Sequence, residues 1–168
     1  PSSLSFDKLP WLETGEVIFQ DDFSDQSTGW EKVNSPYELK GYSAGGYLIS
    51  VKTQNSRAWS VVNLPLSDTE IRVKTEKISG PGDTNFGLIC RFRNEDNFYS
   101  FLIGSDGYYA IIKVENGDET LLGSDQFTYS EQINLGSALN QIEAICSGNE
   151  LSLSINGQLL QTVKDTSF

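Results

Sequence analysis

The stretch NFGLICRFRNEDNFYSFLIGSDGYYAIIKVE, residues 85–115, decides the fold class of this chain. It contains three short runs of mostly apolar residues, which are separated by polar turns at residues 94–97 and 105–107. Runs of this length that are rich in aromatic and β-branched residues favour strands, and connections this short join antiparallel neighbours. The stretch therefore predicts a three-stranded antiparallel meander.

The same kind of pattern continues on both sides of this stretch. Residues 68–79 alternate apolar and polar side chains, which is typical of a strand with one buried and one solvated face. Residues 140–146 and 150–155 flank a turn, and Asn156-Gly157 between apolar runs is a strong hairpin signal. Further strands are predicted at residues 16–20, 47–51 and 57–64. With almost no helical periodicity, the chain is predicted to be an all-β, two-sheet antiparallel sandwich.

Composition excludes several classes of function. The chain carries a net charge of −11, and its 12 Lys and Arg residues are scattered, so we expect no nucleic-acid partner. No apolar run approaches the roughly 20 residues of a membrane helix, so we expect no membrane insertion. The sequence has no His, which removes Ser-His-Asp and Cys-His catalysis within the chain. Any catalysis would have to rest on carboxylates, Tyr, Lys or Arg.

Two regions follow from composition and patterning. Residues 1–15 begin with the Ser- and Pro-containing segment PSSLSFDKLP and are predicted to be a linker or N-terminal extension. Residues 16–168 are predicted to form one domain. Since the sequence starts at Pro and contains no Met, we expect it to be part of a larger, processed protein.

Five segments in order resemble a known family. They are DDFS…GW, GGYLISV, EIRVKTEKISGPGD, FGLICRFRNEDNFYSFLIGSDGYYAIIKV and NELSLSINGQLLQTVKDTSF. Over roughly residues 16–168 they resemble the concanavalin A-like, laminin-G-like jelly-roll modules of bacterial extracellular proteins. The resemblance implies two curved antiparallel sheets, a concave sheet that often holds carbohydrate, and a secreted or surface location. It also implies a structural calcium in some members and glycoside hydrolase activity in others.

The end of the sequence departs from this family. Relatives usually continue past a segment like KDTSF, residues 164–168, with a Gly-containing strand and a closing strand. The domain is therefore expected to lack its closing strands. Open sheet edges invite pairing with another chain, so a homodimer through these edges is expected.

The two cysteines, Cys90 and Cys146, both lie in predicted strands. In a reducing compartment they would be two buried thiols. In an exported domain a single pair forms the simplest disulfide, and this is the interpretation that we favour.

Calcium is the one cofactor that the sequence suggests, although none is required. Asp21, Asp22 and Asp25 cluster in one loop, and hard cations bind several oxygen ligands at once. The alternative is that these carboxylates cap turns or stay in water.

Aromatic residues near arginines are the main signal for ligand binding. Sugars present apolar faces ringed by hydroxyls, so their sites combine flat rings with polar donors. The candidate rings are those of Trp30, Trp59, Tyr99, Tyr108 and Tyr109, and the candidate donors are Arg91, Arg93 and Lys113. Among them, the predicted ligand-binding residues are Arg91, Arg93, Tyr99, Trp59 and Tyr109. Core packing for the rings, and ion pairs for the arginines, are the alternatives.

Strict alternation decides which side chains these strands are expected to expose. On residues 86–93 it puts Phe92 with Cys90 on the core face and puts both arginines on the other face. Tyr108 and Tyr109 point to opposite faces, so only one of them can belong to a site.

These observations predict a non-catalytic extracellular module that binds a glycan or polysaccharide. One alternative is a structural or protein-interaction module, which predicts no concave pocket and full burial of Trp59 and Tyr99. The other is a carboxylate-dependent glycoside hydrolase, which needs two acids about 5 to 10 Å apart, one of them with a raised pKa. No Glu-x-Asp occurs in the chain, and such a motif carries the acids in laminarinase-type enzymes of this fold.

Overall fold

A computed structural model describes residues 16–62, 64 and 66–168. The predicted linker, residues 1–15, lies outside the described residues. All regular secondary structure in the described part is β-strand, and every strand pair is antiparallel. No helix long and apolar enough to cross a membrane occurs in these ranges. The prediction of an all-β fold is confirmed.

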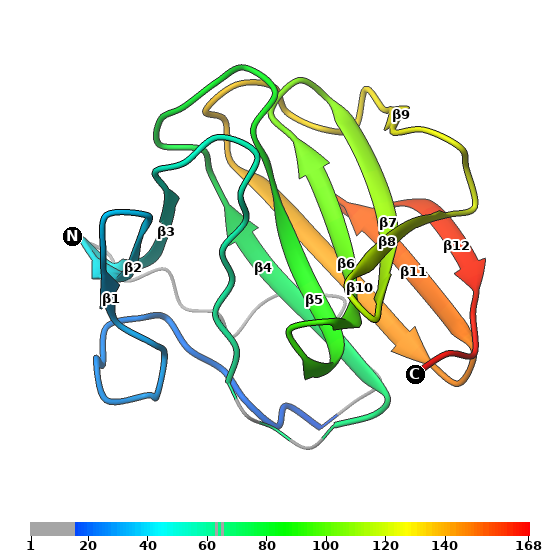
Figure 1. Ribbon diagram of the computed structural model, residues 1–168, viewed down its shortest axis with the longest axis horizontal. Coiled ribbons are helices and arrows are strands. Elements are labelled where there is room, and N and C mark those ends of the chain that lie inside the picture. The colour runs from blue at the N-terminus through cyan, green and yellow to red at the C-terminus, as the bar shows by residue number, and fades with distance from the viewer. Residues whose placement is uncertain (1–15, 63, 65) are drawn as a thin grey trace. The chain divides into compact units, whose positions relative to one another are not determined.

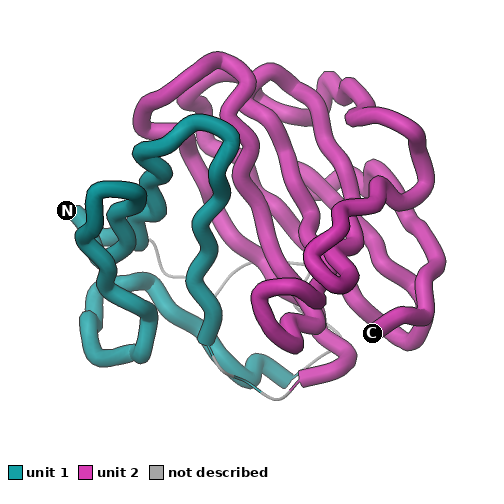
Figure 2. Tube along the Cα trace, viewed as in Figure 1, with its two compact units in different colours: residues 1–64 teal, residues 65–168 magenta. Residues whose placement is uncertain are grey.

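The chain divides into two compact units, residues 1–64 and residues 65–168 (Figure 2). This boundary falls inside the predicted domain of residues 16–168. That those residues form one domain stays a prediction, and each unit is described by itself.

Unit 1 contains a three-stranded sheet in the order β1-β2-β3. Its strands are β1 (Val33–Asn34), β2 (Glu38–Ser43) and β3 (Gly46–Val51). Ala44 and Gly45 join β2 to β3, and both have positive φ, as a tight two-residue hairpin turn requires. Residues 16–20 and 57–62 contain no strand, so the strands predicted there from short apolar runs are wrong.

Unit 2 contains the two sheets of the sandwich (Figure 1). The five-stranded sheet has β5 (Asn85–Asn94), β6 (Asn97–Gly104), β7 (Tyr108–Glu115) and β8 (Asp118–Leu122) in sequence order, and β9 (Thr128–Tyr129) also pairs with β7. The four-stranded sheet runs β12 (Gln158–Lys164), β11 (Glu150–Ile155), β10 (Asn140–Ser147), β4 (Thr69–Thr75). The meander predicted over residues 85–115 is confirmed as β5, β6 and β7. The homodimer expected through open sheet edges stays a prediction.

The main core lies between these two sheets. On β6 and β7 the odd-numbered side chains point into it, because successive residues of a strand face opposite ways. The buried members of this cluster are Cys90, Tyr99, Phe101, Ile103, Tyr109, Ile111, Ile133, Ile142, Ala144, Cys146, Leu151, Leu153, Ile155 and Val163. The predicted disulfide is present within it, between Cys90 on β5 and Cys146 on β10, so it links the two sheets.

The even-numbered side chains of β6 and β7 form a second apolar cluster on the other face of the five-stranded sheet. Its buried members are Phe98, Ala110, Ile112 and Val114. Both faces of these central strands are therefore buried, which explains why their sequences are apolar nearly throughout.

The alternation predicted for β5 fails at Arg91. Cys90 pairs with Tyr99 and Asn94 pairs with Asn97, so three residues of β5 lie opposite the single residue Phe98. Arg91 has φ of 49°, in the left-handed region, as expected at a β-bulge. The bulge turns Phe92 away from the core face of Cys90 and packs it in the second cluster, against Phe98.

Candidate functional site

Two of the predicted ligand-binding rings belong to the core. Tyr99 is 0 % exposed and Tyr109 is 8 % exposed, so neither ring can stack on a ligand. Both residues occupy inward-facing positions of β6 and β7, where period-two alternation carries them between the sheets. For these two residues the alternative of core packing is correct.

The hydroxyl of Tyr99 holds the last residues of the chain in place. It donates a 2.5 Å hydrogen bond to Asp165 Oδ1, and burial together with this bond raises the pKa of Tyr99 to about 12. Burial alone would raise the pKa of Asp165, but hydrogen bonds from Tyr99 and Ser167 and the charge of Lys113 lower that pKa to about 2. Neither group changes charge near neutral pH, so the pair stabilises structure and is unsuited to acid–base chemistry.

Arg91 is a structural residue of unit 2. Its guanidinium donates to the backbone oxygens of Ser67, Phe168 and Gly148 and to Asp68 Oδ1, at 2.7–3.0 Å. The side chain is only 8 % exposed. It joins three segments that are distant in sequence, and the alternative that it pairs with a neighbouring acid is correct.

Arg93 differs from Arg91 because its donors are unused. Its guanidinium carbon lies 4.9 Å from the centroid of the Phe168 ring, and the side chain is exposed. It makes no hydrogen bond to any residue that the structure describes. The two arginines line one depression of about 380 Å³ together with Leu66, Ser67, Asp68, Phe92, Gly148 and Phe168.

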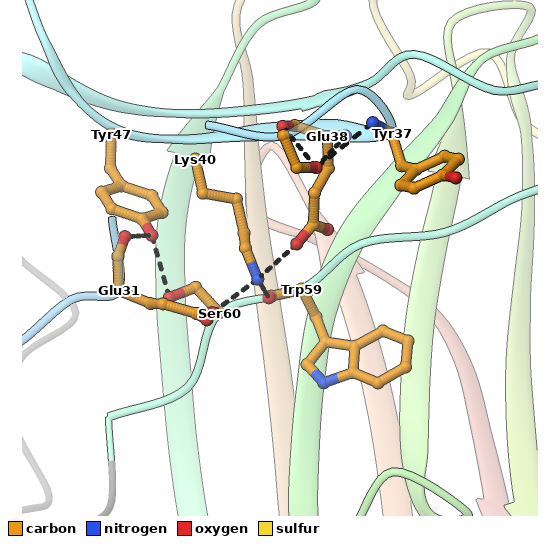
Figure 3. Close-up of polar contacts among 8 residues, drawn as sticks. Glu31, Tyr37, Glu38, Lys40, Tyr47, Trp59 and Ser60 are labelled. Carbon is orange, nitrogen blue, oxygen red and sulfur yellow. Dashed lines mark hydrogen bonds and ion pairs between the residues drawn. The ribbon is translucent and has the colours of Figure 1, made fainter. Parts of the chain in front are cut away.

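The remaining predicted residue, Trp59, lies in unit 1 beside a buried lysine (Figure 3). Lys40 is buried and donates to Glu31 Oε2 and, at 3.0 Å, to the backbone oxygen of Trp59, and it also pairs with Glu38 at 3.4 Å. Burial alone would lower the pKa of Lys40, but its carboxylate neighbours outweigh burial and raise that pKa. The half-buried indole of Trp59 points away from this group (Figure 3).

The polar group around Lys40 is fully paired. Tyr47 completes it by donating to the backbone oxygen of Glu31 and contacting Ser60 Oγ at 3.0 Å, and burial raises the pKa of Tyr47. A lysine with three acceptors has no donor left for a ligand. This group therefore links residues 31–60 of unit 1 to one another and is a poor candidate for binding.

Unit 1 also has a depression of about 300 Å³ beside β1 and β2, lined by Gln26, Lys32, Val33, Asn34, Leu39, Lys40, Gly41 and Tyr42. The ammonium of Lys32 lies 5.1 Å from the centroid of the Tyr42 ring. Since this cation covers the ring face, the face is not open for stacking by a sugar.

The aspartates proposed as calcium ligands cap turns instead. Asp22 and Asp25 each accept a backbone N–H two residues ahead. Asp21 accepts from the amide of Phe23, the Trp30 indole and Thr28. Among residues 16–62, 64 and 66–168, no three acidic, Cys or His side chains gather as a metal site would require. Local turn hydrogen bonds engage the carboxylates of these three residues, so the structure supports the turn-capping alternative, and calcium binding in this loop stays a prediction.

One pair of acids meets part of the glycosidase expectation. Arg72 on β4 bonds to Glu143 on β10 at 2.6 Å and pairs with Glu70. Burial and the nearby Glu143 raise the pKa of Glu70, against the opposing effect of Arg72. The two carboxylates share one guanidinium on the sheet face, and neither lines the depression around Arg93 or the one in unit 1. This arrangement is an ion-pair cluster that joins β4 to β10.

The most exposed aromatic pair in unit 2 is Tyr108 and Tyr129, here called the tyrosine pair. They lie opposite one another on β7 and β9, with ring centroids 5.5 Å apart and ring planes at 68°. They are 42 % and 51 % exposed. Neither hydroxyl has a hydrogen-bond partner in the part of the chain that the structure describes.

Gly107 positions the tyrosine pair. A Cβ at this residue would lie 2.7 Å from a carbon of the Tyr129 ring and 3.0 Å from Leu135, so only glycine lets them approach. Gly107 also has φ of +93°, which disfavours any side chain. Backbone hydrogen bonds from Ser130 to Gly107 and from Gly136 to Ser105 fix the surrounding loops. The rings therefore stand on a rigid part of unit 2.

Of the two adjacent tyrosines, the sequence-based prediction favoured Tyr109, which is buried, over Tyr108, which is exposed. Alternation correctly indicates that Tyr108 and Tyr109 face opposite ways, but the pattern does not say which face is the core. Tyr129 lies in the least regular part of the sequence, residues 127–139. The turn Ser105-Asp106-Gly107 beside Tyr108 was the available signal, because an aromatic residue at a strand end next to a glycine turn is often exposed.

The comparisons with known proteins bear on the fold. No protein-family model matches the chain, and no curated protein is significantly similar to it. The carbohydrate-binding module CBM66 from Bacillus subtilis has a similar structure, with a TM-score of 0.58 and 19 % identity over 84 % of this chain and 82 % of that chain. Sheep galectin-11, in complex with glycerol, matches with a TM-score of 0.43 and 13 % identity over 59 % of this chain and 72 % of that chain. The likeness to CBM66 supports a β-sandwich of the concanavalin A-like type.

Proposed function

We propose that this chain is a non-catalytic module that binds a carbohydrate at the tyrosine pair. The observation that carries the proposal is that Tyr108 and Tyr129 are adjacent, exposed and rigidly held, with both hydroxyls unused. Covering the exposed apolar surface of two adjacent rings with a partner is favourable.

The geometry of the pair suits a sugar ring. A pyranose or furanose has an apolar face of C–H groups, which packs on an aromatic ring, and an edge of hydroxyls, which needs donors and acceptors. With ring planes at 68°, one tyrosine can lie under the sugar while the hydroxyl of the other reaches its edge. Phenolic hydroxyls both donate and accept, so they can pair with sugar hydroxyls in either sense.

Three further observations support a non-catalytic binding role outside the cell. CBM66 is a carbohydrate-binding module, and likeness of fold supports a similar role here by analogy. The Cys90–Cys146 disulfide favours an oxidising compartment, such as the exterior of a bacterial cell. The absence of His in the sequence supports binding without catalysis.

The test is a glycan array followed by calorimetry with the tightest ligand. We expect Tyr108→Ala and Tyr129→Ala each to weaken binding about tenfold, and the double variant to abolish it. Tyr37→Ala is the matched control, because Tyr37 is a 68 % exposed tyrosine in unit 1. Thermal melts of all variants should stay close to that of the parent, since exposed rings contribute little to the core.

A second candidate function is a docking module for another protein. The complete burial of Tyr99 fits this alternative, whereas the half-buried Trp59 does not. Leu135, 54 % exposed, adds an apolar side chain beside the tyrosine pair. The glycan array distinguishes the two functions. If no glycan binds at millimolar concentration, the carbohydrate proposal is wrong and docking of another protein is favoured.

A further inference from the structure

The depression around Arg93 has the features of a site for a negatively charged group. It has a volume of about 380 Å³ and lies in unit 2. It contains the guanidinium of Arg93, whose donors are unused, and apolar walls from Leu66, Phe92 and Phe168. Hydrogen bonds from Arg91 hold the backbone around it in place.

Arg91 holds the segments that line the depression together. Its four hydrogen bonds join residues 67–68, the turn at Gly148 and the segment that ends at Phe168. Asp68 Oδ1 also accepts from the amide of Gly148, at 3.1 Å, which closes the same wall. The lining segments are therefore held whether or not a ligand is bound.

Arg93 is the cation in this depression that no acidic side chain of the described residues pairs with. Arg91 is paired with Asp68, at 3.0 Å between Nη2 and Oδ1, which leaves Arg93 without a carboxylate partner in the described part of the chain. Such a site attracts an anionic group of a ligand.

The contact with Phe168 orients the guanidinium without using its donors. The centroid distance of 4.9 Å is typical of a cation–π contact, in which the aromatic ring meets the flat face of the group. The N–H bonds lie in the plane of the guanidinium, so they stay available at its edge. A planar edge of paired donors matches the two oxygens of a carboxylate.

We infer that Arg93 binds the carboxylate of an acidic sugar, a uronate, through a bidentate contact at the edge of its guanidinium. This inference rests on the proposed carbohydrate-binding function and names a class of ligand for a second position. Arg93 lies near the end of β5, beside the first residues of β6, whereas Tyr108 begins β7. In the antiparallel ladder these points lie at opposite ends of the sheet, so each position can be tested separately.

The test uses D-glucuronate and D-glucose, which differ by one carboxylate, in NMR titrations of the whole chain. Glucuronate should shift the amide signals of residues 66–68, 92–94, 148 and 168, and glucose should not. Arg93→Gln should weaken glucuronate binding at least tenfold, and Arg93→Lys should retain part of it, because a lysine keeps the charge but cannot form the planar contact. Lys164→Gln is the control, since it removes an exposed charge of unit 2 elsewhere, and it should bind as the parent does.

Three outcomes would overturn the inference: equal shifts with glucose, unchanged binding by Arg93→Gln, or acetate binding as tightly as glucuronate. The last result would leave an anion site with no preference for a sugar. Tyr108→Ala/Tyr129→Ala separates this inference from the proposed function. Glucuronate binding should survive in that variant, whereas neutral glycans should lose affinity there and keep it in Arg93→Gln.

Discussion

Cys90 on β5 is bonded to Cys146 on β10, and this bond passes through the core that the two sheets of unit 2 share. The two cysteines are 56 positions apart in sequence, so the bond restricts a long loop of the unfolded chain. In the chain-entropy model a loop of this length corresponds to about 4 kcal/mol of stabilisation. We expect Cys90→Ala/Cys146→Ala to lose about that much free energy of unfolding in guanidinium titrations.

The thiol content of the parent protein gives an independent check of this bond. Unfolded but unreduced protein should show no reactive thiol. Two reactive thiols per chain would contradict the disulfide and would assign any loss in the double variant to packing alone.

Asp165 makes the stability of unit 2 depend on acid pH. Its pKa is about 2 in the folded chain, below the ordinary value of 3.8, so its contribution is present above about pH 4 and is lost as the pH falls toward 2. Asp165→Asn should cost about 1–2 kcal/mol at neutral pH, and this cost should shrink toward zero near pH 2. Urea unfolding at both pH values measures it. Asp118 is an exposed aspartate at the start of β8, so Asp118→Asn is the control and should change the free energy of unfolding little at either pH. An equal loss of stability in Asp165→Asn at both pH values would contradict this role of Asp165.

Gly87 is required by the close approach of β5 and β6. A Cβ at this position would lie 1.8 Å from the backbone oxygen of Phe101, and backbone cannot move aside as a flexible side chain can. We expect Gly87→Ala to destabilise the chain by about 3 kcal/mol or more, or to prevent folding. Gly82→Ala is the matched control, because a Cβ there meets no atom within 4 Å and φ is not in the left-handed region. Equal melting temperatures for the two variants would show that the register of β5 on β6 is wrong.

Calcium should not affect stability. The carboxylates of Asp21, Asp22 and Asp25 already accept hydrogen bonds from turn amides and neighbouring side chains. Because these bonds place the three carboxylates in local turns, they do not converge on one point as the ligands of a single cation must. Thermal melts in calcium and in chelator should therefore have the same midpoint. A melting temperature that is several degrees higher in calcium would indicate a calcium site in this loop.

The local sequence pattern was enough to predict the fold, because the strands follow from period-two alternation and the hairpins from their turn residues. The meander of β5, β6 and β7 and the hairpin at Asn156-Gly157 are confirmed with nearly the predicted bounds. Residues 16–20 and 57–62 were predicted to be strands from short apolar runs, and they contain none. A strand needs a hydrogen-bonding neighbour as well as a suitable sequence.

The site was less predictable for two physical reasons. The bulge at Arg91 places Phe92 on the opposite face of the sheet from the one that alternation predicts. No sequence pattern predicts this bulge, because an arginine with positive φ has no local signature. In addition, alternation shows that Tyr108 and Tyr109 face apart but does not show which face the second sheet covers. That depends on long-range packing, and it made Tyr109 a core residue and left Tyr108 exposed.

Amide chemical-shift mapping locates the carbohydrate site that we propose at the tyrosine pair. Isotope-labelled protein is titrated with the tightest neutral ligand from the glycan array. We predict that the largest shifts fall on residues 105–109 and 128–136, around Tyr108 and Tyr129, and disappear in Tyr108→Ala/Tyr129→Ala. Saturable binding with its largest shifts elsewhere, and none at these residues, would contradict the account.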